Sequence, residues 1–253
     1  MSIDPTEIKK RNGVNFVIWA FWAGKAMNKT RQLSFDMMRS HVGVPVILVD
    51  LENLDQLILP EYPLHPAFQY LSVVHKSDYL RAYLAHHWGG GWHDIKATEV
   101  SFEKAWDEFR DESVYLVGRK ESQKGAARVF DKDNNWMPDK WEDLVITSAY
   151  VVRANNPFTK ELLQQMDKVL DENSDLLRRY PAKHPRERKL ESKNMLQEIF
   201  NRVKNLYAGR THHYPLPWTY IGNAFQPLVY KYREHVRQTL PSDLQRWAGV
   251  KHR

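Results

Sequence analysis

Residues 77–99 read Ser-Asp-Tyr-Leu-Arg-Ala-Tyr-Leu-Ala-His-His-Trp-Gly-Gly-Gly-Trp-His-Asp-Ile-Lys-Ala-Thr-Glu, a pattern that predicts a helix, an abrupt stop and a short charged strand. Ser77 is a good N-cap, and apolar residues recur at helical spacing as far as Trp88. Three glycines then end the helix, because glycine adopts left-handed backbone without penalty. In a strand over 92–96 alternate side chains share a face, so we expect Asp94 and Lys96 to point the same way.

Asp78 and Arg81 lie on the side of this helix opposite to its apolar face, and two interpretations of them stay open. As an exposed pair they would stabilise the helix by less than about 1 kcal/mol and have no further role. As part of a site they would act together with the strand that follows. The triple glycine favours a site, since glycine in regular structure usually marks close approach of a ligand or of another backbone.

The residues upstream predict a strand over 14–21, a helix over 28–41 and a second strand over 46–49. This order is typical of the opening of a nucleotide-binding α/β sheet, in which ligands bind beyond the carboxyl ends of the strands. Trp19, Trp22 and Asp50 are therefore candidates to contact a nucleotide. The tryptophans fit core packing equally well, and Asp50 fits an ordinary turn.

The run Ser-Asp-x-x-Arg at 77–81, followed by Gly-Gly-x-Trp-x-Asp-x-x-Ala-Thr, resembles the sugar-transferase families related to capsular polysaccharide synthesis proteins and to DXD-containing mannosyltransferase-like enzymes. The upstream Ile-Trp-Ala-Phe-Trp at 18–22 is similar to their first strand, Ile-Trp-x-x-Trp. Together these matches extend over about the first hundred residues. The resemblance implies an α/β fold of the GT-A-like type, a single nucleotide-binding domain with a mainly parallel central sheet, flanking helices and a helical C-terminal part.

The same resemblance implies a glycosyltransferase, a hexosyl- or pentosyltransferase of polysaccharide biosynthesis, that moves a sugar from a nucleoside diphosphate sugar to a glycan acceptor. In that role Asp94 would dock the diphosphate, directly or through Mn²⁺ or Mg²⁺, and Lys96 with Arg81 would stabilise the leaving phosphate. Asp78 would orient hydroxyls of the donor, and Gly90 and Gly91 would allow the donor close to the backbone.

The second acid of the family's Asp-x-Asp motif is replaced here, because the chain reads Asp94-Ile95-Lys96. A protonated lysine cannot ligate a hard cation, but its fixed charge can stabilise a phosphate directly. The sequence therefore leaves both metal-dependent and direct binding of the diphosphate open.

The resemblance also implies a carboxylate general base and a late histidine ligand in the second half of the chain, so later residues supply further candidates. Glu142 or Asp143, ahead of a predicted strand over 145–152, is a candidate general base, although acids before a strand are common. His212 or His213 is a candidate metal ligand, and only one of the two can reach a site, since neighbours on an extended chain face opposite ways. Trp218 and Asn223 fit an acceptor subsite or ordinary packing.

The whole chain of 253 residues is expected to form a single domain, with a nucleotide-sugar-binding half at about 14–118 and an acceptor-side half at about 141–253. The absence of cysteine excludes a disulfide framework and a cysteine nucleophile. With neither a signal-peptide pattern nor an apolar run of roughly 18 to 20 residues, we expect a cytoplasmic protein without a membrane anchor.

The formal net charge of +6 leaves a rival function open. The stretch 178–193 is rich in arginine and lysine and favours a non-catalytic protein that binds a polyanion or nucleic acid. Aromatic residues are nearly absent from it, which argues against a stacking platform for single strands. Nucleic acid is therefore not an expected partner.

Overall fold

A six-stranded mixed sheet forms the centre of the protein in the computed structural model, which describes residues 4–24, 26–130, 133–182, 184–190, 192, 194–210 and 213–243. The strand order is β4-β3-β5-β7-β6-β8, with parallel pairing at β3/β4, β3/β5 and β6/β8. Only β7 runs against its neighbours, so the expectation of a mainly parallel sheet is confirmed. The strands are β3 (Ile18–Phe21), β4 (Val46–Val49), β5 (Gly90–His93), β6 (Leu116–Lys120), β7 (Val145–Val152) and β8 (Val236–Arg237).

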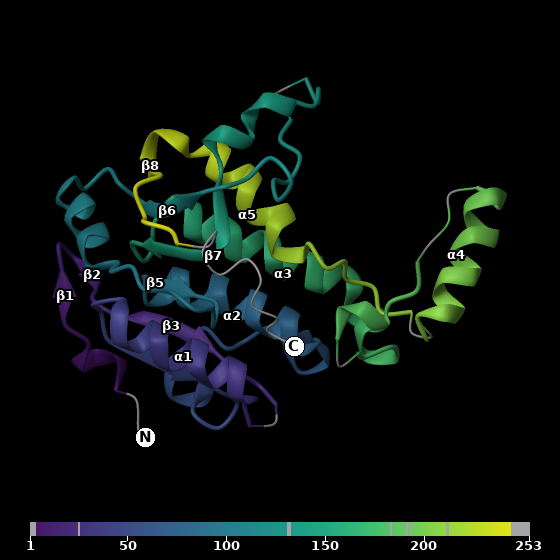
Figure 1. The fold of residues 1–253 in the computed structure, drawn as a ribbon, viewed down its shortest axis with the longest axis horizontal. Coiled ribbons are helices and arrows are strands. Elements are labelled where there is room, and N and C mark those ends of the chain that lie inside the picture. The colour runs from purple at the N-terminus through teal and green to yellow at the C-terminus, as the bar shows by residue number, and fades with distance from the viewer. Residues whose placement is uncertain are drawn as a thin grey trace.

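Helices cover both faces of the sheet, as Figure 1 shows. The described α-helices are α1 (Lys29–His41), α2 (Val73–His87), α3 (Pro157–Arg179), α4 (Met195–Tyr207) and α5 (Tyr220–Lys231). Short 3₁₀ segments lie at Pro5–Glu7, Leu54–Leu57, Pro66–Tyr70, Glu103–Arg110, Pro138–Asp143, Pro185–Glu187 and Arg233–His235, and β1 (Lys10–Arg11) pairs with β2 (Val14–Asn15) in a separate ribbon.

Alternation along the strands divides the core into two layers. Trp19 and Phe21 of β3 pack in a cluster with α2, α3 and α5, whereas Ile18 and Ala20 pack in a second cluster with α1 and the 3₁₀ segment Glu103–Arg110. Successive strand side chains point to opposite faces, so one short strand contributes to both layers. The sheet is therefore buried on both sides, and its strand ends are where a ligand can reach it.

Helix α2 begins earlier than the sequence predicts. Its N-cap is Ser72, whose side chain accepts a hydrogen bond from the backbone of His75, and not Ser77. Asp78 therefore lies in the second turn, away from the helix end. The predicted helix at 28–41 is confirmed with Asn28 as its cap, and the strands at 46–49 and 145–152 have the predicted bounds.

The glycine run holds β5 close against β3. Gly89 and Gly90 adopt positive φ angles of 64° and 90°. A Cβ on Gly90 would lie 3.0 Å from the carbonyl oxygen of Val17, and one on Gly91 would lie 2.9 Å from the Ile18 side chain. Strand β5 consequently begins within the glycines and ends at His93, two to three residues earlier than the predicted strand.

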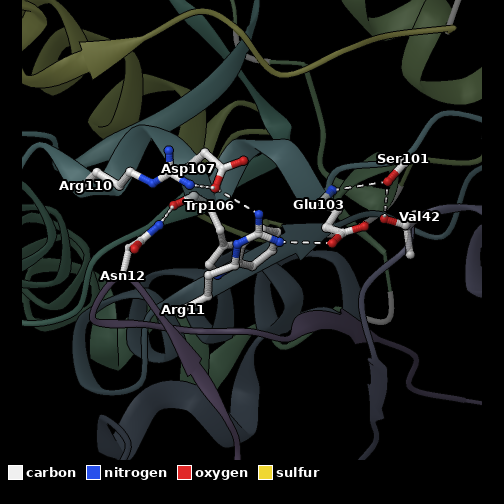
Figure 2. A network of polar contacts seen from close by, with 8 residues as sticks. All are labelled: Arg11, Asn12, Val42, Ser101, Glu103, Trp106, Asp107 and Arg110. Carbon is white, nitrogen blue, oxygen red and sulfur yellow. Dashed lines mark hydrogen bonds and ion pairs between the residues drawn. The ribbon is translucent and has the colours of Figure 1, made fainter.

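A polar network anchors the chain that follows β5, as Figure 2 shows. Arg11 bonds Glu103 at 3.0 Å and Asp107 at 2.8 Å, and the Asn12 side chain donates to the carbonyl of Trp106 at 2.9 Å. These bonds fix the 3₁₀ segment on its sheet face. The residues around Asp94 are therefore restrained on both sides, by β5 before them and by the anchored 3₁₀ segment after them.

Within the described ranges, no helix combines the length and the apolar character that crossing a bilayer requires.

Candidate functional site

A cavity of about 1050 Å³ lies beyond the carboxyl ends of β3 and β5, at the upper end of the roughly 300–1,000 Å³ of small-molecule sites. Parallel strands bring their carboxyl ends to the same edge of a sheet, which is where α/β folds bind ligands. The charged and polar residues that line the cavity are Arg31, Ser77, Asp78, Arg81, Asp94, Lys96, His184 and Arg186, and its aromatic residues are Phe21, Trp22, Trp92 and Trp218.

Arg81 contacts both of the carboxyl groups that line the cavity, those of Asp78 and Asp94. Its Nη2 lies 2.9 Å from Asp94 Oδ1 and 3.5 Å from Asp78 Oδ1. Its Nη1 donates to the carbonyl of Thr147 at 2.6 Å, and the guanidinium lies 4.9 Å from the ring of Trp92. Asp78 and Arg81 are both buried, so the interpretation of them as an exposed helix pair is wrong.

Asp94 and Lys96 point into the cavity together, as the sequence predicts. Lys96 Nζ lies 3.4 Å from Asp94 Oδ2, and the side chains retain 34% and 30% of their exposure. Trp92 Nε1 donates to Asp94 Oδ1 at 3.1 Å. Both carboxylate oxygens of Asp94 therefore have protein donors as partners. Lys96 is partly exposed, so a ligand in the cavity can contact its ammonium group.

The two carboxyls differ in their proton affinity. Burial alone would raise the pKa of Asp94, but the charges of Arg81 and Lys96 and the Trp92 hydrogen bond outweigh it and bring the pKa to about 2. Burial raises the pKa of Asp78 to about 7, because the single charge of Arg81 does not offset the loss of water. Asp94 is a permanent anion near neutral pH, and Asp78 titrates there.

Asp78→Asn is expected to change how stability depends on pH. The folded-state pKa of Asp78, about 7, lies above its ordinary value of 3.8, so the native state binds this proton more tightly than the unfolded chain. Its contribution is complete below about pH 4 and is lost as the pH rises to about 7, by up to about 1.4 kcal/mol per pH unit. Urea titrations across that range should show wild-type stability falling relative to Asp78→Asn.

The same substitution at Asp143, which is partly exposed and lies outside the cavity lining, is the matched control. A stability difference between wild type and Asp78→Asn that stays constant from pH 4 to pH 8 would contradict a raised Asp78 pKa.

Two tryptophans at the cavity are each accompanied by an arginine that the sequence did not single out as a site residue. The guanidinium of Arg31 lies 5.6 Å from the ring of Trp22, and Arg31 Nη1 donates to the carbonyl of Ile95 at 2.5 Å. Arg186 lies 5.1 Å from the ring of Trp218. The cavity therefore carries positive charge on two further walls.

Several predicted donor contacts lie elsewhere. Trp19 is buried in the core, where its Nε1 donates to the carbonyl of Gly89 at 2.8 Å. Asp50 is a turn residue, because its Oδ1 accepts the backbone N–H groups of Glu52 and Asn53, both at 2.9 Å. Gly90 and Gly91 are enclosed against β3. Of the predicted donor-side residues, the described cavity lining includes Trp22, Asp78 and Arg81, besides Asp94 and Lys96.

The candidates from the second half of the chain are also dispersed. Asp143 is partly exposed and pairs with Lys140 at 3.7 Å, and Asn223 is exposed on α5. His213 lies in a separate hollow, with its ring 5.4 Å from that of Tyr180. His212 lies outside the described residues. Trp218 alone among these reaches the cavity.

Comparison with known proteins adds little to this picture. No protein-family model matches the chain, and no curated protein matches it. Among solved structures, the chain is similar to one described as "PaToxG Glycosyltransferase", with 13% sequence identity, a TM-score of 0.37 and 89% of each chain covered. At that identity and TM-score the likeness decides neither fold nor activity.

Proposed function

We propose that the protein is a glycosyltransferase that moves a sugar from a nucleoside diphosphate sugar to a glycan acceptor. The observation that carries the proposal is the Asp94–Lys96 pair, which is fixed on Arg81 and faces a large cavity at the carboxyl ends of two parallel strands. The motif at 77–98 that resembles sugar transferases supplies all three of these residues.

The charge of the cavity suits a diphosphate. Four cations (Arg31, Arg81, Lys96 and Arg186) and two carboxyls (Asp78 and Asp94) line it, so their sum is positive even when both carboxyls are ionised. Lys96 is paired with Asp94 at 3.4 Å and is partly exposed, and it can therefore turn towards a phosphate. Fixed positive charge at the leaving phosphate stabilises the transition state of sugar transfer.

The donor set does not fit the Mn²⁺ or Mg²⁺ that the family resemblance implies. A hard cation needs several oxygen ligands, but Asp94 is held by Arg81, Trp92 and Lys96, and Asp78 faces Arg81. The described residues contain no group of three His, Asp or Glu side chains that suits a metal. We therefore propose that protein cations contact the diphosphate directly.

The acceptor would enter along the wall formed by Trp218, whose half-exposed ring offers an apolar face to a sugar. During transfer the bond from the anomeric carbon to the diphosphate breaks, a bond to the acceptor oxygen forms, and the acceptor hydroxyl loses its proton. Of the two cavity carboxyls, Asp78 has the pKa suited to accepting a proton, since Asp94 stays ionised.

Lys96→Ala is expected to lower the release of nucleoside diphosphate from the donor by about 100-fold, because it removes the movable charge beside the leaving phosphate. Wild-type turnover is expected to persist in excess EDTA. A panel of UDP- and GDP-sugars, with a coupled assay of the released nucleoside diphosphate, measures both effects.

Lys140→Ala is the matched control, because this lysine is paired with Asp143 outside the cavity lining. Turnover that requires added manganese and is indifferent to Lys96→Ala would contradict direct binding of the diphosphate. The absence of turnover and of nucleotide binding, with a polyanion bound through 178–193, would favour the non-catalytic alternative.

A further inference from the structure

Helix α4 presents an apolar face to solvent. In the part of the chain that the structure describes, no residue of this helix is buried, and Figure 1 shows it well away from the sheet. Seven large apolar side chains are between 60% and 96% exposed: Met195, Leu196, Ile199, Phe200, Val203, Leu206 and Tyr207. Exposed apolar surface of this extent usually marks an interaction site.

These side chains form one stripe. At 100° per residue they fall within one side of the helix, and the polar residues Gln197, Glu198, Asn201, Arg202, Lys204 and Asn205 occupy the other. The helix is held in its loop by two bonds between Asn205 and the backbone of Leu190, at 2.8 Å and 3.2 Å. The apolar stripe takes no part in those bonds.

The chain's surplus positive charge is concentrated, in the sequence, in the residues of this helix and those next to it. The docking segment, defined as residues 178–210, holds ten of the chain's 37 basic residues and three of its 31 acidic ones, a net charge of +7. The other 220 residues hold 27 basic and 28 acidic residues, a net charge of −1. The apolar stripe thus lies inside a strongly cationic neighbourhood.

We propose that the docking segment binds the surface of an anionic lipid bilayer. An amphipathic helix of this kind lies in the interfacial plane, where its apolar side chains enter the acyl boundary and its basic residues attract anionic headgroups. A second copy of the chain would cover the apolar stripe, but the two docking segments, each with a net charge of +7, would repel one another. A nucleic acid would satisfy the charge and leave the stripe exposed.

A basic hollow connects the docking segment to the cavity. It has a volume of about 390 Å³ and is lined by Arg186, Arg188, Lys189 and Arg210, next to Trp218. Arg186 and Trp218 also line the central cavity. Docking through this segment would therefore hold one wall of the cavity close to anionic headgroups.

The test is sedimentation of the full chain with vesicles of phosphatidylcholine alone and of equal parts phosphatidylcholine and phosphatidylglycerol. We expect binding to the anionic vesicles that falls with added salt, and little binding to the neutral ones. Ile199→Asp/Phe200→Asp should weaken it roughly tenfold or more, since it puts charge into the apolar stripe. Removing Arg202 and Lys189 by alanine should weaken it about fivefold for each charge.

Leu33→Asp is the matched control, because Leu33 is 69% exposed on α1, in another part of the molecule. It should leave vesicle binding unchanged, and circular dichroism should show that each variant is folded. Three results would overturn the proposal: equal binding to both vesicle types, a dimer in solution that Ile199→Asp/Phe200→Asp dissociates, or oligonucleotide binding at least as tight as vesicle binding. None of these measurements uses a sugar nucleotide, so the outcome is independent of the proposed enzymatic activity.

Discussion

Asp94→Asn is expected to lower the turnover of the nucleoside diphosphate sugar by about three orders of magnitude. The substitution keeps the shape of the side chain but removes the charge that positions Lys96 and pairs with Arg81. Asparagine keeps one acceptor oxygen but has neither the charge nor the second acceptor oxygen, so it cannot hold two cations in a fixed geometry. Steady-state release of nucleotide from the preferred donor measures the effect.

Asp143→Asn is the informative control, since it makes the same chemical change at the carboxyl that the sequence suggested as a base. Asp143 is partly exposed and lies outside the described cavity lining, so turnover should stay within about twofold of wild type. Loss of turnover in Asp143→Asn together with normal turnover in Asp94→Asn would move the site away from this cavity.

Arg81→Met is expected to lower the free energy of unfolding by about 3–5 kcal/mol, the range found when one partner of a buried ion pair is removed. Methionine fills much of the space but leaves Asp78, Asp94 and the carbonyl of Thr147 without the donor they share. Urea unfolding at pH 7.5, followed by tryptophan fluorescence, measures the change.

Arg110→Met is the control for this substitution, because Arg110 makes an exposed pair with Asp107 at 3.2 Å. That pair should contribute less than about 1 kcal/mol. Equal losses of stability in the two variants would show that Arg81 is not a buried organising charge.

The sequence allows four of the residues that line the cavity to be predicted as neighbours, because they lie close together in the chain. Asp78 and Arg81 come from α2, and Asp94 and Lys96 come from the residues directly after the strand that follows it, so helical periodicity and chain proximity place them with few assumptions. Their burial could not be predicted in the same way. It depends on Thr147 of β7, which packs beside β5 from far along the chain.

The start of α2 shows how packing overrides a local signal. Ser72 and Ser77 are both good caps, but Val73 and Val74 follow Ser72, and β-branched residues have low helix propensity. The structure begins the helix at Val73 nonetheless, and both valines line the cavity. The additional helical turn therefore contributes part of the cavity lining, and no local sequence pattern predicts this contribution.

The walls of the cavity were the least predictable part. Arg31 enters from the first turn of α1, and Arg186 and Trp218 enter from the chain on either side of α4. Only the tertiary fold brings them to Asp94. Conversely, the rule that ligands bind at the carboxyl ends of strands selects Trp19 and Asp50 as site residues. Trp19 instead points into the core, and Asp50 closes a turn. Periodicity also predicts that β7 is a strand without predicting that it runs antiparallel.

The central claim is that the cavity at Asp94 and Lys96 binds a nucleoside diphosphate sugar. The most direct measurement is a thermal-shift screen of wild type and Asp94→Ala against UDP and GDP and their sugars, each in EDTA and in manganese, with CMP and its sugars as the monophosphate comparison. We predict that one of the two diphosphate families raises the melting temperature of the wild type equally in both conditions and leaves Asp94→Ala unchanged. The absence of a shift with every nucleotide, or an equal shift in Asp94→Ala, would contradict the claim.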